Sequence, residues 1–174
     1  MGVLIDMFTR GGPVRPKDVL AAVARDPACC KDTDEKTGNT PLHFTCCNGA
    51  PIELVRALLR AYPGAASVED GDGNLPLHGA ASCGAAPDVI EMLLEANPGA
   101  ARHLANGQTP LHHIAVMKER PATVALAKLL LASGGKAKVM DASGKRPSEL
   151  GAGRATPRGE LTALLKRHEL LVLG

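Results

Sequence analysis

Histidine and cysteine are the residues of this sequence that could most readily do chemistry. The chain of 174 residues contains six histidines and five cysteines. His43, Cys46 and Cys47 stand close together, so a zinc site is the first hypothesis to weigh. Structural zinc sites usually show Cys-x-x-Cys pairs or a regularly spaced quartet of cysteines and histidines. Neither pattern is present, and the sequence therefore predicts no metal site and no cofactor.

The cysteines indicate a reducing compartment. Their number is odd, and four of them form two adjacent pairs, which make a poor disulfide framework. Residues 1–10 lack the basic region of a secretory signal, so we expect the protein in the cytosol or the nucleus. The alternative use of these residues is a redox-responsive thiol at Cys29, Cys30, Cys47 or Cys83. We expect Cys29 and Cys30 to be exposed, in a loop that follows a helix.

Composition excludes several other classes of function. No apolar run reaches the roughly 18 residues of a membrane span, and a net charge of +2 attracts nucleic acid only weakly. Two Phe, one Tyr and no Trp leave little for stacking on bases. The motifs G-x-S-x-G, the P-loop and G-x-G-x-x-G with a following acidic residue are missing. The sequence predicts a protein that is not an enzyme and binds neither membranes nor nucleic acid.

An internal repeat organises the chain. Pro-Leu-His begins at Pro41, Pro76 and Pro110, at intervals of about 35 residues, and Pro147 begins a degenerate fourth copy. A glycine-containing turn signal precedes each copy, which predicts a tight, hairpin-like turn. Three of these turns carry an acidic residue three positions before the glycine, namely Glu35, Asp70 and Asp141; Leu104 takes this place in the third copy.

Each copy also predicts two helices. The first helices are expected over 44–48, 79–83 and 113–117. The second begin at a proline, which suits the first helical turn, and their leucines and valines recur at helical spacing; these prolines are Pro51, Pro87 and Pro121. The chain ends show weaker forms of the same pair. We expect helices over 3–9 and 16–25, a weak first helix over 148–151 and a last second helix over 161–170.

These motifs resemble the ankyrin repeat family, whose pattern is a D-x-x-G turn, then T-P-L-H-x-A, then two antiparallel helices. Two copies read Thr-Pro-Leu-His, and Leu75 replaces the threonine in the copy between them. The resemblance implies an all-α solenoid of stacked antiparallel helix pairs joined by β-hairpin-like turns, with about four to five repeats including caps. It also implies a structural role for His43, His78 and His112, which would bond backbone near the turn and in the next repeat.

The same resemblance divides the chain into an N-terminal cap, three repeats and a C-terminal cap. These units are expected over residues 1–34, 35–69, 70–103, 104–140 and 141–174. Together they form one continuous domain.

Ankyrin repeat proteins bind other proteins through their turn tips and the exposed side of their first helices, and the resemblance implies this use here. By position, the predicted face comprises Lys36, Asn39, Phe44, Cys47, Asn48, Asp72, Asn74, Ser82, Cys83, Asn106, Gln108, His113, Val116, Met117 and Lys145. Phe44, His113 and Met117 are its only large candidate anchors. Because Tyr and Trp, the commonest hot-spot residues, are missing from it, we expect modest affinity.

The function that we expect is a non-enzymatic protein–protein interaction module or scaffold. It would be monomeric on its own and bind a partner protein through the concave face of the stack. The alternatives are the redox-responsive binding protein described above and the targeting part of a larger protein.

Overall fold

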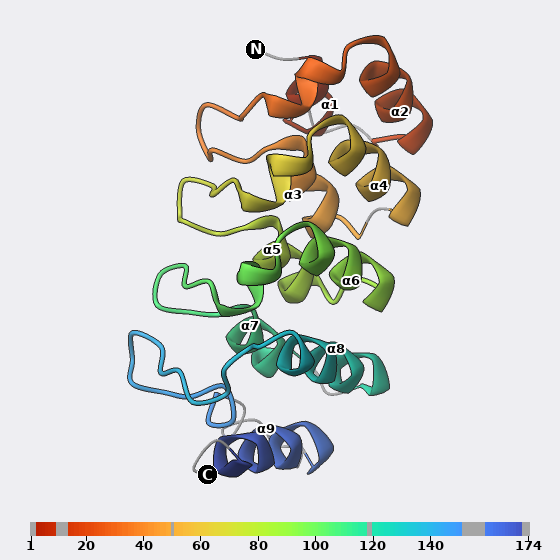
Figure 1. Ribbon diagram of the computed structural model, residues 1–174. Helices are drawn as coiled ribbons and strands as arrows, with labels where there is room; N and C mark the ends of the chain where they lie inside the picture. Colours follow the sequence, from red (N-terminus) through yellow and green to blue (C-terminus); the bar gives the residue numbers. More distant parts are fainter. Residues whose placement is uncertain (1–2, 10–13, 50, 118–119, 151–158, 172–174) are drawn as a thin grey trace.

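The helices of the protein stack into an elongated array. The computed structural model describes residues 3–9, 14–49, 51–117, 120–150 and 159–171. Successive helix pairs lie one after another from the N-terminus to the C-terminus, and the long turns project to the same side (Figure 1). Within the described residues there is no strand, and a single β-bridge joins Ala105 to Gln108. The predicted all-α solenoid is confirmed.

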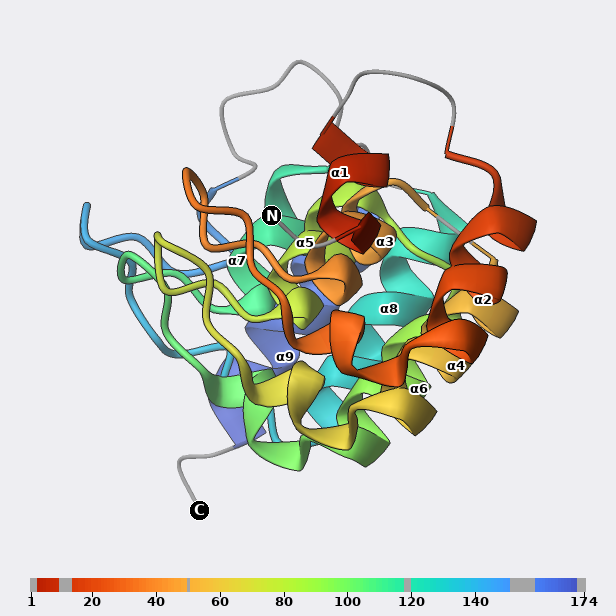
Figure 2. The same ribbon diagram turned by 90° about the horizontal axis from the view of Figure 1, so that it is seen from above.

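The helices form two rows. The inner row consists of α1 (Val3–Thr9), α3 (Pro41–Cys47), α5 (Pro76–Cys83) and α7 (Pro110–Val116). The outer row consists of α2 (Pro16–Arg25), α4 (Ile52–Ala61), α6 (Pro87–Ala96), α8 (Pro121–Ala132) and α9 (Gly159–Leu171). Seen along the stack, the turns lie on one side, α3, α5 and α7 in the middle, and α2, α4 and α6 on the opposite side (Figure 2).

The inner helices start at the prolines of the repeated motif, three residues earlier than predicted. Proline lacks an amide proton that the first helical turn would leave unpaired, so it suits this position. The leucine that follows each proline points into the layer and is at most 1% exposed. Ala80 and Ala81 of α5 are fully buried, and their small side chains let neighbouring inner helices approach closely.

The outer helices each bury one apolar face. In α4, Leu54, Val55 and Leu58 are buried, whereas Arg56 and Arg60 on the other face are exposed. Burying each such aliphatic side chain contributes about 1.5–3 kcal/mol. A single helix pair cannot cover both of its apolar faces, so the stability of each pair depends on its neighbours.

Three short 3₁₀ helices follow the outer helices and were not predicted. They are η1 (Pro27–Lys31), η2 (Pro63–Ser67) and η3 (Pro98–Arg102). The prolines that were expected only to end the outer helices also begin these segments, and their inner residues are buried. The tetrapeptide Pro-Gly-Ala-Ala occurs in both η2 and η3 and is the signal that could have identified them.

Carboxylates hold the second and fourth turns as predicted. An oxygen of Asp70 accepts hydrogen bonds from the amides of Asp72 and Asn74 at 2.9 and 2.8 Å. An oxygen of Asp141 accepts from the amides of Ser143 and Lys145, both at 2.9 Å. A hydrogen bond from the Ser143 hydroxyl, at 2.7 Å, lowers the pKa of Asp141, and the two amide bonds lower it further.

The first turn corrects the prediction for Glu35. Asp34, and not Glu35, accepts from the Thr37 amide at 2.9 Å and from its hydroxyl at 2.7 Å. This turn is one residue longer than the others, so the D-x-x-G spacing selected the wrong carboxylate. Asp34 is buried, whereas Glu35 is exposed.

The third turn, where Leu104 replaces the acidic residue, has a different geometry. Ala105 and Gln108 exchange two backbone hydrogen bonds, at 2.9 and 2.8 Å. Asn106 and Gly107 between them have φ angles of 49° and 78°. Two successive positive φ values are typical of a type I′ hairpin turn, for which Asn-Gly is the preferred sequence.

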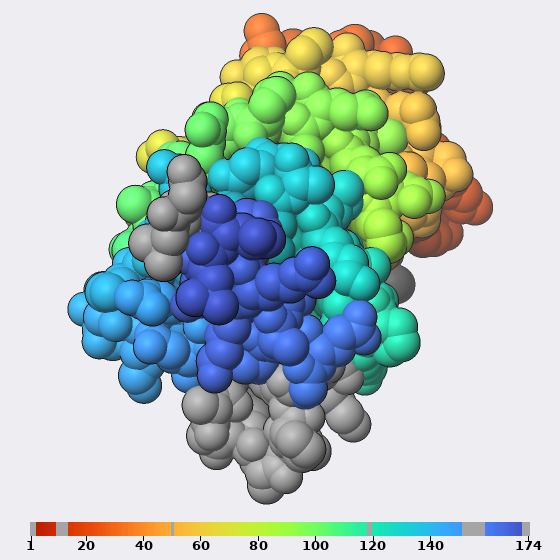
Figure 3. Space-filling model, turned by 60° about the horizontal axis from the view of Figure 1, so that its bottom comes forward, coloured from red at the N-terminus to blue at the C-terminus, as the bar shows by residue number. Residues whose placement is uncertain are grey.

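The C-terminal end departs from the predicted helix pair. The first helix expected over 148–151 is wrong where the structure describes it, because Pro147–Leu150 forms only a turn, and residue 151 lies outside the described residues. The expected second helix is present as α9, which packs against α8 and covers this end of the stack (Figure 3).

Candidate binding face

The first motif histidine joins its own helix to the next turn. His43 Nδ1 accepts a hydrogen bond from the Thr40 amide at 3.2 Å, at the start of α3. Its Nε2 then donates to the carbonyl of Asn74, in the following turn, at 3.0 Å. Since Nδ1 is an acceptor, we assign the ring proton to Nε2. Both ring nitrogens are thereby used, which leaves none to bind a metal.

The other two motif histidines repeat the first of these bonds. His78 Nδ1 accepts from the Leu75 amide at 3.2 Å, and His112 Nδ1 accepts from the Thr109 amide at 3.0 Å. His78 Nε2 bonds the carbonyl of His103 at 3.3 Å. The buried Nε2 of His112 makes no hydrogen bond of good geometry in the described part of the chain, although the backbone of Lys145 and Val139 lies close enough to raise the pKa of the ring. The predicted structural role is confirmed for His43 and His78, which bond both their own helix start and the backbone that follows. For His112, only the bond at the helix start is confirmed.

Burial keeps these imidazoles neutral. Desolvation lowers the pKa of His43 and His112. For His78, desolvation together with the neighbouring His113 lowers the pKa to about 4. These rings are consequently neutral at physiological pH and act as fixed hydrogen-bonding groups.

A second set of imidazole contacts ties α5 to α7. The ring of His78 packs edge-on against the rings of His103 and His113, each with centroids 5.6 Å apart. His113 Nδ1 pairs with the hydroxyl of Ser82 at 3.0 Å. The exposed side of the inner helices is therefore held in place by polar contacts between consecutive repeats.

A hollow of about 190 Å³ opens between these inner helices and the turns. Its walls come from the first and second turns, from α3 and α5, and from His113 of α7. The lining residues are Asn39, His43, Cys47, Asp70, Asn74, Leu75, His78, Gly79, Ser82 and His113.

The structure brings together part of the predicted face in this hollow. Five predicted residues line it, namely Asn39, Cys47, Asn74, Ser82 and His113. Seven others are exposed elsewhere on turns and helix ends: Lys36, Asn48, Asp72, Cys83, Asn106, Val116 and Lys145. His78 and Leu75 also line the hollow but were not predicted to do so. The motif places both in the buried interior, and a buried residue is not expected to contact a surface hollow.

Two of the three large side chains of the predicted face pack against other residues of the protein. Phe44 is half-buried and stacks on Phe8 of α1, with ring centroids 5.4 Å apart. Met117 is half-buried, and its terminal methyl lies against Gly84. Gln108 is half-buried in the bridge of the third turn. Of the three anchors, only His113 lines the hollow.

The cysteines fall into two environments. Cys29 and Cys30 are buried in η1, so the expected exposure of this pair is wrong. Burial raises the pKa of Cys29, and raises that of Cys30 to about 12, so neither is an activated thiol. Cys46 is fully buried, while Cys47 and Cys83 are exposed. Among the described residues no group of three or more His, Cys, Asp and Glu side chains is arranged to hold a metal ion.

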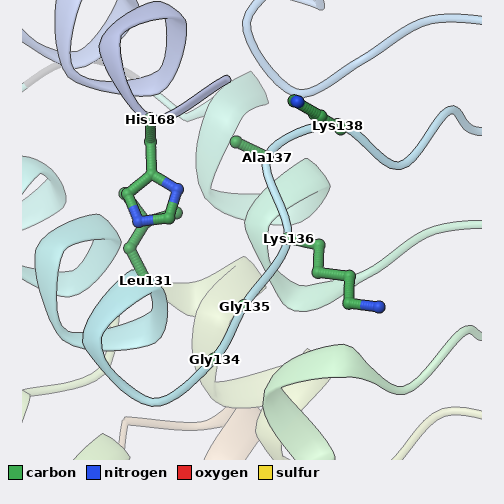
Figure 4. Close-up of a pocket in the computed structure, with 7 residues that line it drawn as sticks. All are labelled: Leu131, Gly134, Gly135, Lys136, Ala137, Lys138 and His168. Atoms are coloured by element: carbon green, nitrogen blue, oxygen red, sulfur yellow. The ribbon is translucent and has the colours of Figure 1, made fainter. Parts of the chain in front are cut away.

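A second hollow, of about 290 Å³, lies where α8 ends and α9 packs against it (Figure 4). Leu131 and His168 face it from these two helices, and the segment from Gly134 to Lys138 forms the rest of its wall. It contains no residue of the predicted face. None of the helices that the structure describes combines the length and the apolar character needed to cross a bilayer.

The stacked helix pairs and their regular turns define a repeat protein of the solenoid type. A family model of three ankyrin repeats matches residues 18–102, and a model of a single ankyrin repeat matches residues 106–145. Since these matches cover more than half of the chain, it belongs to the ankyrin repeat family. Members of this family are generally protein–protein interaction modules and typically not enzymes. A comparison with curated proteins gives no match to the chain.

Proposed function

We propose that the protein is a non-enzymatic scaffold or interaction module that binds a partner protein through the concave face between its turns and inner helices. The observation that carries this proposal is the hollow between α3, α5 and their turns. Its volume of about 190 Å³ corresponds to roughly six waters, which is room for one partner side chain.

The chemistry of this face favours a partner that supplies the large anchors itself. The helices α3, α5 and α7 contain no Asp, Glu, Lys or Arg. Charges are confined to the turns, with exposed Glu69 and Asp72 at the second turn and exposed Lys145 at the fourth. Recognition would therefore combine uncharged inner helices with the carboxylate of Asp70 in the hollow and charged turn tips at its edge.

A blocking substitution at Ser82 tests this proposal. Ser82 is exposed and lines the hollow, so the guanidinium of Ser82→Arg would occupy the space meant for the partner. The partner is first captured from native lysate with the wild-type protein, identified by mass spectrometry, purified and titrated against both proteins. We expect Kd to rise at least about tenfold, or roughly 1.4 kcal/mol.

Ser67→Arg is the matched control. Ser67 is exposed at the end of η2 and does not line the hollow, so the same added charge should leave Kd unchanged. An unchanged Kd for Ser82→Arg, with a melting temperature equal to that of the wild type, would contradict binding at the hollow.

The division of the chain after residues 34, 69, 103 and 140 belongs to the same proposal, as do a monomeric state and a location in the cytosol or nucleus. The turn carboxylates support the division, because Asp70 and Asp141 stand at the start of two of the proposed units. The odd number of cysteines and their two adjacent pairs support a reducing compartment.

A further inference from the structure

Two exposed cysteines from consecutive repeats meet on the concave face. Cys47 is the last residue of α3, and Cys83 is the last residue of α5. The inner helices α3 and α5 pack directly against each other. The Cys83 thiol lies close enough to Cys47 to raise its pKa, after the larger effect of burial.

Gly79 makes this meeting possible. A Cβ atom at Gly79 would lie only 2.5 Å from Cys47 Sγ, so the sulfur occupies the space that a side chain would fill. Gly79 and Cys83 are four residues apart on α5 and hence on the same face of that helix. Cys47 Sγ therefore rests on α5 one turn before Cys83.

The neighbouring repeats lack this arrangement. The position equivalent to Gly79 is Phe44 in α3 and His113 in α7, both large side chains. The position equivalent to Cys47 is Ser82 in α5, and its hydroxyl bonds the ring of His113 instead. The paired thiols are thus specific to the contact between α3 and α5.

We propose that Cys47 and Cys83 are a redox modification site, which forms a reversible disulfide between α3 and α5 on the concave face. The oxidant is a low-molecular-weight disulfide such as oxidised glutathione. One protein thiolate attacks a sulfur of this disulfide, breaks its S–S bond and releases one glutathione thiolate, which takes up a proton. The second protein thiol loses its proton, attacks the protein sulfur of the mixed disulfide and releases the second glutathione. Two protein thiols are oxidised and one glutathione disulfide is reduced to two thiols.

The other cysteines do not compete for this reaction. Cys29, Cys30 and Cys46 are buried, so the oxidant does not reach them in the folded protein. Burial and the neighbouring Cys83 raise the pKa of Cys47 to about 11. Its thiolate is therefore scarce at neutral pH, and we expect the exchange to be slow there and to accelerate as the pH rises.

The disulfide would regulate the proposed binding site, and this consequence rests on the proposed function. Cys47 lines the hollow, and Cys83 belongs to the predicted face. A bridge would pull Cys47 Sγ toward Cys83 and hold α3 and α5 together. Partner affinity should then differ at least tenfold between the reduced and oxidised forms, and equal Kd values would overturn this regulatory step.

The bridge itself is tested without any partner. The folded protein is incubated at alkaline pH with mixtures of oxidised and reduced glutathione, quenched with acid and mapped by mass spectrometry. We expect a peptide pair linked through Cys47 and Cys83, a loss of two hydrogen atoms from the intact mass, and reversal by dithiothreitol. Cys47→Ser and Cys83→Ser should each abolish the link, while Cys29→Ala should retain it.

Gly79→Ala gives a second variant in which both thiols remain. The added methyl group would displace Cys47 Sγ, so we expect the linked fraction to fall at least tenfold while the melting temperature confirms folding. Links between other cysteines, glutathione adducts without a bridge, or no link at all would overturn the proposal. Because the bridge is read by mass and the binding face by the Kd of Ser82→Arg, failure of one is distinguishable from failure of the other.

Discussion

The first and fourth copies of the repeated motif begin with the same hydrogen bond, made by different side chains. In the first, His43 accepts from the Thr40 amide; in the fourth, Glu149 accepts from the Arg146 amide at 2.7 Å. The imidazole has a second nitrogen that donates to the next turn, whereas an ionised carboxylate has no proton to donate. The histidine thus starts its own helix and also attaches the following repeat, whereas Glu149 of the fourth copy makes only the first bond, in a segment that forms a turn and not a helix over residues 147–150.

The last copy is attached in another way. Ser148 donates to a carboxylate oxygen of Glu169 in α9 at 2.5 Å, and Arg146 pairs with the other oxygen at 3.4 Å. These contacts join the fourth turn to the capping helix instead of to another turn. Among the described residues, a helix and not another turn follows the fourth copy, which agrees with the loss of histidine there.

The largest loss of stability is expected when His43 is replaced. His43→Ala leaves the buried Thr40 amide without a partner, removes one of the two donors to the Asn74 carbonyl and deletes a buried ring, so we expect the free energy of unfolding to fall by about 3 kcal/mol. The measurement is urea denaturation followed by circular dichroism.

His112→Ala is the matched variant for that measurement. His112 is equally buried, but its Nε2 makes no hydrogen bond of good geometry to the next turn, so its loss should cost about 1 kcal/mol less than the loss of His43. Equal costs would show that the bond to the next turn contributes nothing.

The second effect concerns pH. An unfolded histidine binds its proton as the pH falls through about 6.5, whereas the lowered pKa of His78, about 4, keeps the folded ring neutral. The unfolded state therefore binds more protons between these values, and the free energy of unfolding falls with the pH. His78 alone should account for about 2 kcal/mol between pH 6.5 and 5.

The corresponding comparison is between wild type and His78→Asn, by denaturation at several pH values. The variant should lose stability less steeply below pH 6.5, and parallel curves would contradict the assignment. Asp34 and Asp141, whose pKa values are lowered, affect stability only at lower pH, because their contribution is lost as the pH falls below about 3.8.

The smallest effect is expected at Glu149. Glu149→Ala removes the acceptor for the Arg146 amide at an exposed turn, so the cost should be about 1 kcal/mol, typical of one lost hydrogen bond. Glu149→Gln keeps an oxygen acceptor and should retain most of the stability. A Gln variant as unstable as the Ala variant, by thermal denaturation, would argue against a role for this bond.

The register of the fold follows from the sequence because the Pro-Leu-His copies fix both a helix start and a buried leucine. The wrong predictions concern residues whose environment depends on packing or turn length and not on the local sequence pattern. Asp34, and not Glu35, holds the first turn because the carboxylate there lies one residue further from the glycine than the motif predicts. Cys29 and Cys30 are buried because Pro27 starts a 3₁₀ helix as well as ending α2. The contact between Cys47 and Gly79 depends on how two helices approach each other, which no single repeat reveals.

The bond from His43 to Asn74 has a consequence for how the protein unfolds. In a linear array, the free energy of unfolding is the sum of the intrinsic stabilities of the repeats and of the interactions between neighbouring repeats. The bond from His43 to Asn74 is an interaction between neighbouring repeats. Unfolding the second turn removes a partner from α3, so the two units melt together. At His112 no hydrogen bond of good geometry reaches the next turn, so this coupling is weaker. The array should therefore separate first between residues 104–140 and 141–174, with hydrogen exchange fastest on the C-terminal side of that junction.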